Sequence, residues 1–325
     1  MTVLHSIDEL EHYLCGRPFV STMGYFDGMH LGHQALIATL AQKASTQGCA
    51  SVLITLDRHP QEVLRPDLPT PECLTPLPDK LRLLSGQPIE ATLVIPFSKN
   101  LADQTPEAFL EPLIRLGLKG LVLGYDNRFG RKEPGQSLQE FDTRLLALGL
   151  PVHRISQVLV HDKGVSSTAI RRCIKTCDFE TATQMLGRPY SLVGEVVTGS
   201  RIGRTLSYPT ANIRPTFAQQ VLPGEGIFAA EVRVGRSVYP AMAYLGHRPS
   251  IGRDLEQRLE AYLLGYSGSL YDRQVEIAFR KHLRPDQTFA TRAELAQRLA
   301  LDEAITQAFF AHHPLLLQIG SDPKP

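Results

Sequence analysis

Two histidines at the start of a predicted helix form the first candidate site. His30 and His33 are three residues apart with Gly32 between them, and they follow a turn that contains Gly24 and Gly28. Imidazole groups and the unpaired amides of a helix start can point at one anion, which suits a phosphate group. The glycine spacing matches neither the dinucleotide-binding motif nor the phosphate-binding loop with its lysine. The same residues also fit a tight turn with two surface histidines.

A second segment supplies hydroxyl groups and a guanidinium. Ser166, Ser167 and Thr168 precede a predicted short helix, and Arg171 follows them. Hydroxyl donors combined with a guanidinium suit the phosphate tail of a nucleotide. A helix cap followed by a solvated arginine is the alternative interpretation of this segment.

A third group of residues lies in the second half of the chain. A loop with Gly199, Gly203 and Arg204 is flexible and basic enough to wrap a diphosphate. Thr210 and Asn212 are two residues apart, so their side-chain oxygens share one face of an extended chain and suit Mg²⁺. A turn in which these polar side chains bond to their own backbone is the alternative.

One carboxylate interrupts an apolar strand further along the chain. Glu260 lies within the run Leu259–Leu264, where burial of its charge would lower stability unless the group were paired or functional. A kinase that acts on an alcohol needs a carboxylate to orient the hydroxyl and take its proton, which makes Glu260 a candidate base. A solvated glutamate on an edge strand is the alternative.

The elements that must position these residues change in type along the chain. Residues 1–186 alternate between short apolar strands and amphipathic helices, a pattern that indicates βαβ units and a parallel sheet covered on both faces. The expected strands are Phe19–Met23, Ser51–Leu56, Thr92–Ile95, Gly120–Leu123 and Val152–Ile155. The expected helices are His33–Gln47, Thr105–Leu116 and Ser137–Leu148.

The second half has the pattern of an antiparallel barrel or sandwich. Its expected strands are Val193–Val197, Gly226–Val234, Val238–Tyr244, Leu259–Leu264 and Gln274–Phe279. Glycine-rich turn clusters separate them, and a helical pattern returns at Arg292–Phe310. We therefore expect two domains of different class, at residues 1–186 and 187–325.

The composition excludes several classes of protein. The chain has 325 residues, enough for two domains, and its 34 basic and 33 acidic residues leave a net charge of +1. A nucleic-acid-binding protein would show a basic face, and a membrane protein would show apolar runs of about 18 residues. The first twenty residues lack the pattern of a signal peptide. Five cysteines, an odd number, suit reduced thiols in the cytoplasm.

The first half resembles the H-x-G-H nucleotidylyltransferase superfamily, which implies a Rossmann-like parallel-sheet domain. His30–His33 matches that motif, and Ser166–Arg171 resembles the late S-S-T-x-x-R signature. The longer phrase Gly24–Gln34 is similar to the adenylylating half of the bifunctional bacterial riboflavin kinase/FAD synthetase family. Asp57–Pro60 is near that family's T-F-x-P-H-P, and Gly124–Gly130 is near its G-x-D-F-R-F-G.

This resemblance implies that the phosphate of FMN attacks the α-phosphorus of ATP and releases pyrophosphate. The attacking phosphate is already an anion at pH 7, so the site needs charge stabilisation and in-line positioning in place of a general base. It implies catalytic roles for His30, His33 and Arg171. It assigns nucleotide binding to Gly24, Phe26, Asp27, Gly28, Ser166, Ser167 and Thr168, and flavin binding to His59, Asp126 and Phe129.

The second half resembles the flavokinase domain, which implies a six-stranded antiparallel barrel with a C-terminal helix. Pro209–Ile213 carries the motif P-T-A-N-I intact, and Gly246–Ser250 is near G-x-R-P-T. The implied reaction phosphorylates the ribityl 5′-hydroxyl of riboflavin from ATP. The resemblance implies that Thr210 and Asn212 hold Mg²⁺, or Mn²⁺ in its place, and that Glu260 is the base. It assigns Gly199, Gly203 and Arg204 to the nucleotide loop, and Arg284 to the flavin.

The chain departs from the family pattern at five positions. These are Tyr25, Leu56, Asn127, Tyr244 and Asp272. None of them removes a group with an assigned chemical role. We expect a two-step enzyme with riboflavin, FMN and ATP as substrates and without nucleic-acid or membrane partners. The alternatives are a riboflavin kinase whose first half has lost adenylylation, and a non-catalytic flavin-binding regulator.

Overall fold

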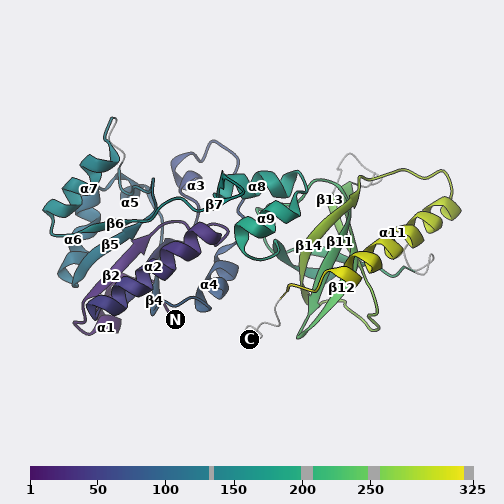
Figure 1. Ribbon diagram of the computed structural model, residues 1–325, viewed down its shortest axis with the longest axis horizontal. Helices are drawn as coiled ribbons and strands as arrows, with labels where there is room; N and C mark the ends of the chain where they lie inside the picture. The colour runs from purple at the N-terminus through teal and green to yellow at the C-terminus, as the bar shows by residue number, and fades with distance from the viewer. Residues whose placement is uncertain (132–134, 199–207, 248–256, 318–325) are drawn as a thin grey trace. The chain divides into compact units, whose positions relative to one another are not determined.

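The chain forms two compact units, Met1–Ser167 and Thr168–Pro325 (Figure 1). The computed structural model describes residues 1–131, 135–198, 208–247 and 257–317. Within these residues, no helix is both long enough and apolar enough to cross a membrane. All five cysteines lie in the described part of the chain, and all are free.

A parallel sheet of six strands forms the centre of the first unit, in the order β1-β4-β3-β2-β5-β6. The strands are β1 (Thr2–Leu4), β2 (Phe19–Met23), β3 (Ala50–Leu56), β4 (Ala91–Ile95), β5 (Leu118–Leu123) and β6 (Val152–Arg154). Every residue of β2 is buried, as expected for a central strand that is covered on both faces. The predicted parallel sheet is confirmed, with β1 added at its edge.

Helices cover both faces of this sheet (Figure 1). On one face lie α1 (Ile7–Leu14), α6 (Pro106–Arg115) and α7 (Leu138–Ala147), and on the other α2 (Leu31–Gln47) and α4 (Leu77–Ser85). Thr105 caps α6 through its side chain, with Pro106 in the first helical position, as predicted. The remaining short elements of this unit are α3 (Pro60–Leu64), α5 (Lys99–Asp103), β7 (Leu159–Val160) and β8 (Lys163–Gly164).

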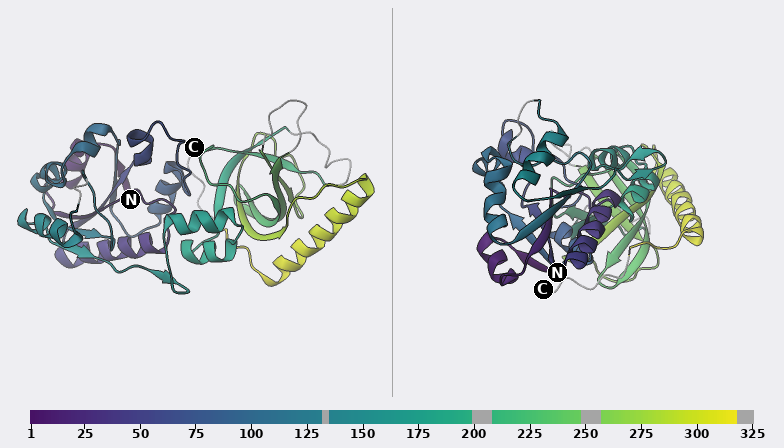
Figure 2. Two further views of the ribbon diagram at one scale, coloured as in Figure 1. Left: turned by 90° about the horizontal axis from the view of Figure 1, so that it is seen from above. Right: turned by 60° about the vertical axis from the view of Figure 1, so that its left-hand side comes forward.

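The second unit is built on a closed antiparallel barrel of six strands, which confirms the expected barrel. Its strands are β9 (Ser191–Val197), β10 (Ala211–Pro215), β11 (Gly226–Val234), β12 (Ser237–His247), β13 (Gln257–Leu263) and β14 (Gln274–Arg284). Their order around the barrel is β10-β13-β12-β11-β14-β9. The left view of Figure 2 looks into the barrel and shows α11 (Arg292–His312) running along its outside.

Two helices lie between the sheet of the first unit and residue 187, and the second of them packs against the barrel. They are α8 (Ser167–Lys175) and α9 (Phe179–Leu186). The ring of Phe179 on α9 lies 5.7 Å from that of Phe228 and 5.6 Å from that of Phe279, both on barrel strands. The second compact unit therefore begins before the barrel's first strand.

Candidate functional sites

The first candidate site is a strained turn between β2 and α2. Phe26 and Met29 adopt left-handed backbone conformations, with φ of 55° and 44°, and Gly28 lies at 84°. Such conformations are uncommon for bulky side chains and concentrate at functional sites. The turn ends at His30, which caps α2 because its Nδ1 accepts a hydrogen bond of 3.3 Å from the amide of His33.

The two histidines of the motif stack on each other. Their ring centroids are 3.6 Å apart and their planes differ by 17°. The pKa of His33 is lowered well below 6.5, mainly by burial and to a smaller extent by the charges of His30 and Lys80. His33 is therefore a neutral imidazole at pH 7, and it offers hydrogen bonds at this site without a charge of its own. The alternative of two surface histidines is wrong for His30, which is buried.

Asp27 and Ser167 hold the turn in place. The buried carboxylate of Asp27 accepts hydrogen bonds from the amides of Leu74, at 2.9 and 3.1 Å, and Thr75, at 3.0 Å. The hydroxyl of Ser167 donates to the backbone carbonyl of Asp27 at 2.8 Å. The side chains of both residues therefore bond to backbone groups at the predicted site. Their roles in nucleotide binding stay predictions. The first residue of α8 lies at this turn, with Thr168 and Arg171 further along the same helix.

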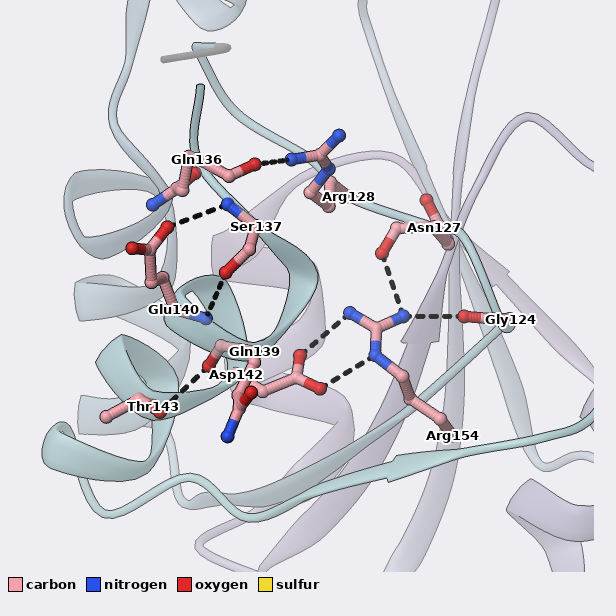
Figure 3. Close-up of polar contacts among 10 residues, drawn as sticks. All are labelled: Gly124, Asn127, Arg128, Gln136, Ser137, Gln139, Glu140, Asp142, Thr143 and Arg154. Atoms are coloured by element: carbon pink, nitrogen blue, oxygen red, sulfur yellow. Dashed lines mark hydrogen bonds and ion pairs between the residues drawn. The ribbon is translucent and has the colours of Figure 1, made fainter. Parts of the chain in front are cut away.

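The loop Gly124–Gly130 follows β5 at the same edge of the sheet (Figure 3). The guanidinium of Arg154 makes two 2.7 Å bonds to Asp142, and it donates to the carbonyl of Gly124 at 2.6 Å and to that of Asn127 at 3.1 Å. The amide of Asn127 donates to the carbonyl of Met23, the last residue of β2, at 2.7 Å. The unusual polar residue at position 127 therefore ties this loop to the central strand.

The three predicted flavin residues of the first unit differ in their surroundings. His59 caps α3 by accepting from the amide of Gln61 at 3.1 Å, and its ring lies edge-on to Tyr25 at 5.0 Å. Asp126 is exposed. Phe129 packs edge-on against Phe109 and Phe141 in the core, at 5.9 and 5.3 Å.

The second candidate site joins Thr210, which directly precedes β10, with Asn212 on β10 and Glu260 on the neighbouring strand β13. Asn212 on β10 pairs directly with Glu260 on β13, so the two side chains share one face of the barrel wall. The hydroxyl of Thr210 donates to the carboxylate of Glu260 at 2.9 Å. Glu260 is only 6% exposed, and its neighbours Leu259 and Ala261 are also buried. The alternative of a solvated edge-strand glutamate is therefore wrong.

An open cavity of about 100 Å³ lies beside Thr210. Tyr262, Tyr266 and Tyr271 contribute to its lining. The ring of Tyr208 meets that of Tyr262 edge-on at 5.1 Å, and its hydroxyl donates to Glu303 on α11 at 3.0 Å. Sequence reasoning missed these tyrosines, although the chain has no tryptophan and any stacking surface must come from phenylalanine or tyrosine.

Arg284, the predicted flavin residue of the second half, contacts the C-terminal helix α11. The guanidinium of Arg284 donates to the fully buried carboxylate of Asp302 on α11, from Nε and Nη2 to Oδ2 at 3.0 and 2.8 Å and from Nε to Oδ1 at 3.2 Å. Arg284 thus anchors the helix, and its role in flavin binding stays a prediction. Gly199, Gly203 and Arg204 lie outside the described residues.

The two units together define a class of protein. The first combines a parallel sheet with a histidine pair at a helix start, and the second combines a closed barrel with a threonine, an asparagine and a buried glutamate. This combination is that of a two-domain nucleotide-dependent transferase. The family model for FAD synthetase matches residues 15–169, and that for riboflavin kinase matches residues 186–310.

Similar proteins define the class more narrowly. The bifunctional riboflavin kinase/FMN adenylyltransferase of Listeria monocytogenes is 33% identical over 90% of this chain and 92% of its own. That of Escherichia coli strain K12 is 31% identical over 94% and 96%. A crystal structure described as a macrolide-efflux protein from Streptococcus pneumoniae shares the fold, with a TM-score of 0.80, 26% identity and coverage of 90% and 94%. The chain belongs to the family of bifunctional riboflavin kinase/FMN adenylyltransferases.

Proposed function

We propose that the two reactions of this bifunctional riboflavin kinase and FMN adenylyltransferase are divided between the two candidate sites. The turn between β2 and α2 carries out adenylylation of FMN, and the β10–β13 face of the barrel carries out phosphorylation of riboflavin. The corresponding functional domains are residues 1–186 and 187–325. The two family matches, which end at residue 169 and begin at residue 186, support this division.

In the first reaction, a phosphate oxygen of FMN forms a bond to the α-phosphorus of ATP, while the bond from that phosphorus to the pyrophosphate breaks. The nucleophile needs no base, so the protein's task is to hold both phosphates in line and to stabilise the charge. We assign that task to His30, His33 and Arg171. The nucleotide lies against Gly24, Phe26, Asp27, Gly28, Ser166, Ser167 and Thr168, and the flavin against His59, Asp126 and Phe129.

In the second reaction, the ribityl 5′-hydroxyl of riboflavin attacks the γ-phosphorus of ATP, and ADP leaves. The hydroxyl must lose its proton, and Glu260 is the group that accepts it. Its burial and its hydrogen bond from Thr210 fix its orientation. Gly199, Gly203 and Arg204 are proposed to bind the nucleotide, and Arg284 to contribute to flavin binding from the end of β14.

Thr210 and Asn212 are the residues proposed to hold Mg²⁺. Oxygen donors from a hydroxyl and an amide suit this ion, which usually keeps several positions for substrate phosphates and water. No cluster of three or more histidine, cysteine or carboxylate side chains suited to a metal occurs among the described residues. When bound, Mg²⁺ neutralises charge on the ATP phosphates.

Three further proposals concern the compartment in which the enzyme works and the partners that it lacks. We propose that it works in the cytoplasm and has no nucleic-acid or membrane partner. The free cysteines and the net charge of +1 support this view.

The observation that carries the assignment is the buried Glu260 with its bond from Thr210, because it supplies a proton acceptor at the site where an alcohol must be deprotonated. The test is a time course with purified protein, riboflavin, ATP and Mg²⁺, with FMN and FAD quantified by chromatography. We expect FMN to appear first and FAD to follow. A parallel reaction started with FMN measures adenylylation alone, and failure to form FAD there would remove the proposed first site.

A further inference from the structure

A buried lysine beneath the first site has no place in the mechanism above. Lys80 lies on α4 and is 1% exposed. Its ammonium donates to the carbonyl of Tyr25 at 2.7 Å, to the hydroxyl of Thr55 at 3.2 Å and to the carbonyl of Leu56 at 3.4 Å. It also lies 4.3 Å from the centre of the Tyr25 ring. A lysine on an amphipathic helix normally extends into solvent, so this placement requires a reason.

Every N–H donor of this ammonium has an acceptor, and all of these acceptors are uncharged. A lysine ammonium has three N–H donors, and Lys80 has three oxygen acceptors. None of the three is a carboxylate, so the charge is buried without a directly bonded counter-ion. Burial of a charge in such surroundings lowers stability. Packing alone would be served better by an apolar side chain of similar length, such as methionine.

The three acceptors belong to the two segments that form the first site. Tyr25 lies in the turn that leads from β2 to His30, whereas Thr55 and Leu56 end β3 and lead to His59. One terminal nitrogen therefore connects the backbone that positions the histidine pair with the backbone that positions a proposed flavin residue.

We propose that Lys80 is a positioning residue for adenylyl transfer, which joins the two loops of the site and adds a fixed positive charge beneath the place where phosphates bind. This inference rests on the proposed function of the first site. Lys80 does not touch the substrate, because its ammonium is enclosed by protein oxygens. It acts through the position of the loop and through its electrostatic field, which is strong in a site of low dielectric.

The charges around Lys80 agree with this role. Burial lowers its pKa to about 8, against attraction from Asp27, Cys73 and Asp57. The positive charge of Lys80 also contributes to the low pKa of His33 on α2. These four groups come from several segments around Lys80, and the ring of Tyr25 also faces its ammonium. The ammonium thus remains charged at pH 7 and loses its proton in mildly alkaline solution.

The test compares Lys80→Met with Lys119→Met. Lys119 is an exposed residue of β5, so its variant makes the same chemical change in the same unit without touching the site. We expect Lys80→Met to lower kcat/KM for FMN adenylylation by about 10- to 100-fold, the size of effect that misplaced reacting groups produce. Riboflavin phosphorylation by the same sample should stay within twofold, and Lys119→Met should leave both reactions unchanged.

A pH profile separates this role from a purely structural one. In the wild-type protein, kcat/KM for ATP in adenylylation should fall as the pH rises above about 8, because Lys80 loses its charge. That fall should be absent in Lys80→Met. Thr55→Val keeps the lysine but removes one of its acceptors and the 3.3 Å hydrogen bond from the Thr55 hydroxyl to the carbonyl of Tyr25. This variant should retain the fall and lose less activity.

Several results would overturn the proposal. Adenylylation by Lys80→Met within twofold of the wild type would do so, as would an unchanged alkaline fall in that variant. If Lys80→Met does not fold, full adenylylation with an unaltered KM in Thr55→Val would overturn it instead. A wild-type protein that makes no FAD from FMN would remove the proposed function itself, which is a different outcome.

Discussion

The hydroxyl of Thr210 donates a 2.9 Å hydrogen bond to the carboxylate of Glu260. One of these residues is proposed to hold Mg²⁺ and the other to take a proton from riboflavin. Glu260 pairs across the strands with Asn212, the second proposed ligand of the ion. The proposed base and the proposed ligands of the ion are therefore held next to one another by strand pairing and a hydrogen bond.

Replacement of Glu260 by glutamine should abolish the kinase reaction alone. The amide keeps the shape of the side chain and its contact with Thr210, but it cannot accept the proton of the ribityl hydroxyl. We expect riboflavin phosphorylation to fall by about 10²- to 10⁴-fold, the usual contribution of a positioned base. The measurement is the initial rate of FMN formation from riboflavin.

Glu195→Gln is the matched control for this experiment. Glu195 is an exposed carboxylate on β9 of the same barrel, where it pairs with Arg214. Its variant should keep normal FMN formation. Normal phosphorylation by Glu260→Gln would show that Glu260 is not the base.

Replacement of His30 by asparagine should have the opposite effect. Asparagine is also a good helix cap, so the start of α2 is retained while the imidazole is lost. We expect FAD formation from FMN to fall by about 10²- to 10³-fold, as when one preorganised donor to a developing charge is removed. His153→Asn, at an exposed position of β6, is the control. Equal rates in the two variants would contradict the role of His30.

The hydrogen bond from Asn127 to Met23 should affect FMN binding. Asn127→Ala removes the 2.7 Å bond that ties the Gly124–Gly130 loop to β2. A bond of this kind contributes about 1 kcal/mol, which corresponds to roughly a fivefold increase in KM for FMN. Asn100→Ala, at an exposed position of α5, should leave KM unchanged. A KM for FMN equal to that of the wild type in Asn127→Ala would show that the loop does not depend on this bond.

The stability of the first unit should rise with pH in alkaline solution. The unfolded chain keeps the Lys80 proton up to the ordinary pKa of 10.5, whereas the folded chain loses it near 8. Between these values the unfolded state binds more protons, so the free energy of unfolding increases with pH, by up to about 3 kcal/mol. Chemical unfolding followed by circular dichroism at pH 7.5 and 10 measures this increase.

Lys80→Met provides the reference for that measurement. Other groups also titrate over this range, but they are common to both proteins. The difference between wild type and variant therefore isolates the contribution of Lys80. A difference that does not change between the two pH values would show that the pKa of Lys80 is not lowered in the folded protein.

Much of the fold could be predicted because its strands are apolar and bounded by turns. The central strand Phe19–Met23 was predicted with its observed limits, whereas β1 has only three residues and too little pattern to detect. Short β10 was likewise absent from the predicted strands, although Thr210 and Asn212 were expected on an extended chain.

The site residues could be predicted where they lie close together in the sequence. The stacked pair of His30 and His33 needs only one helical turn, so the sequence indicates it directly. Lys80 could not be found in this way, because its three acceptors lie 24 to 55 residues away and come together only in the folded sheet. For the same reason, the sequence did not reveal that Arg284 pairs with Asp302 on α11.

The most direct test of the division between two sites assays Glu260→Gln and His30→Asn with each flavin substrate. Glu260→Gln should form FAD from FMN at the wild-type rate and form almost no FMN from riboflavin. His30→Asn should convert riboflavin to FMN at the wild-type rate and form almost no FAD from it. A parallel loss of both reactions in either variant would contradict the account.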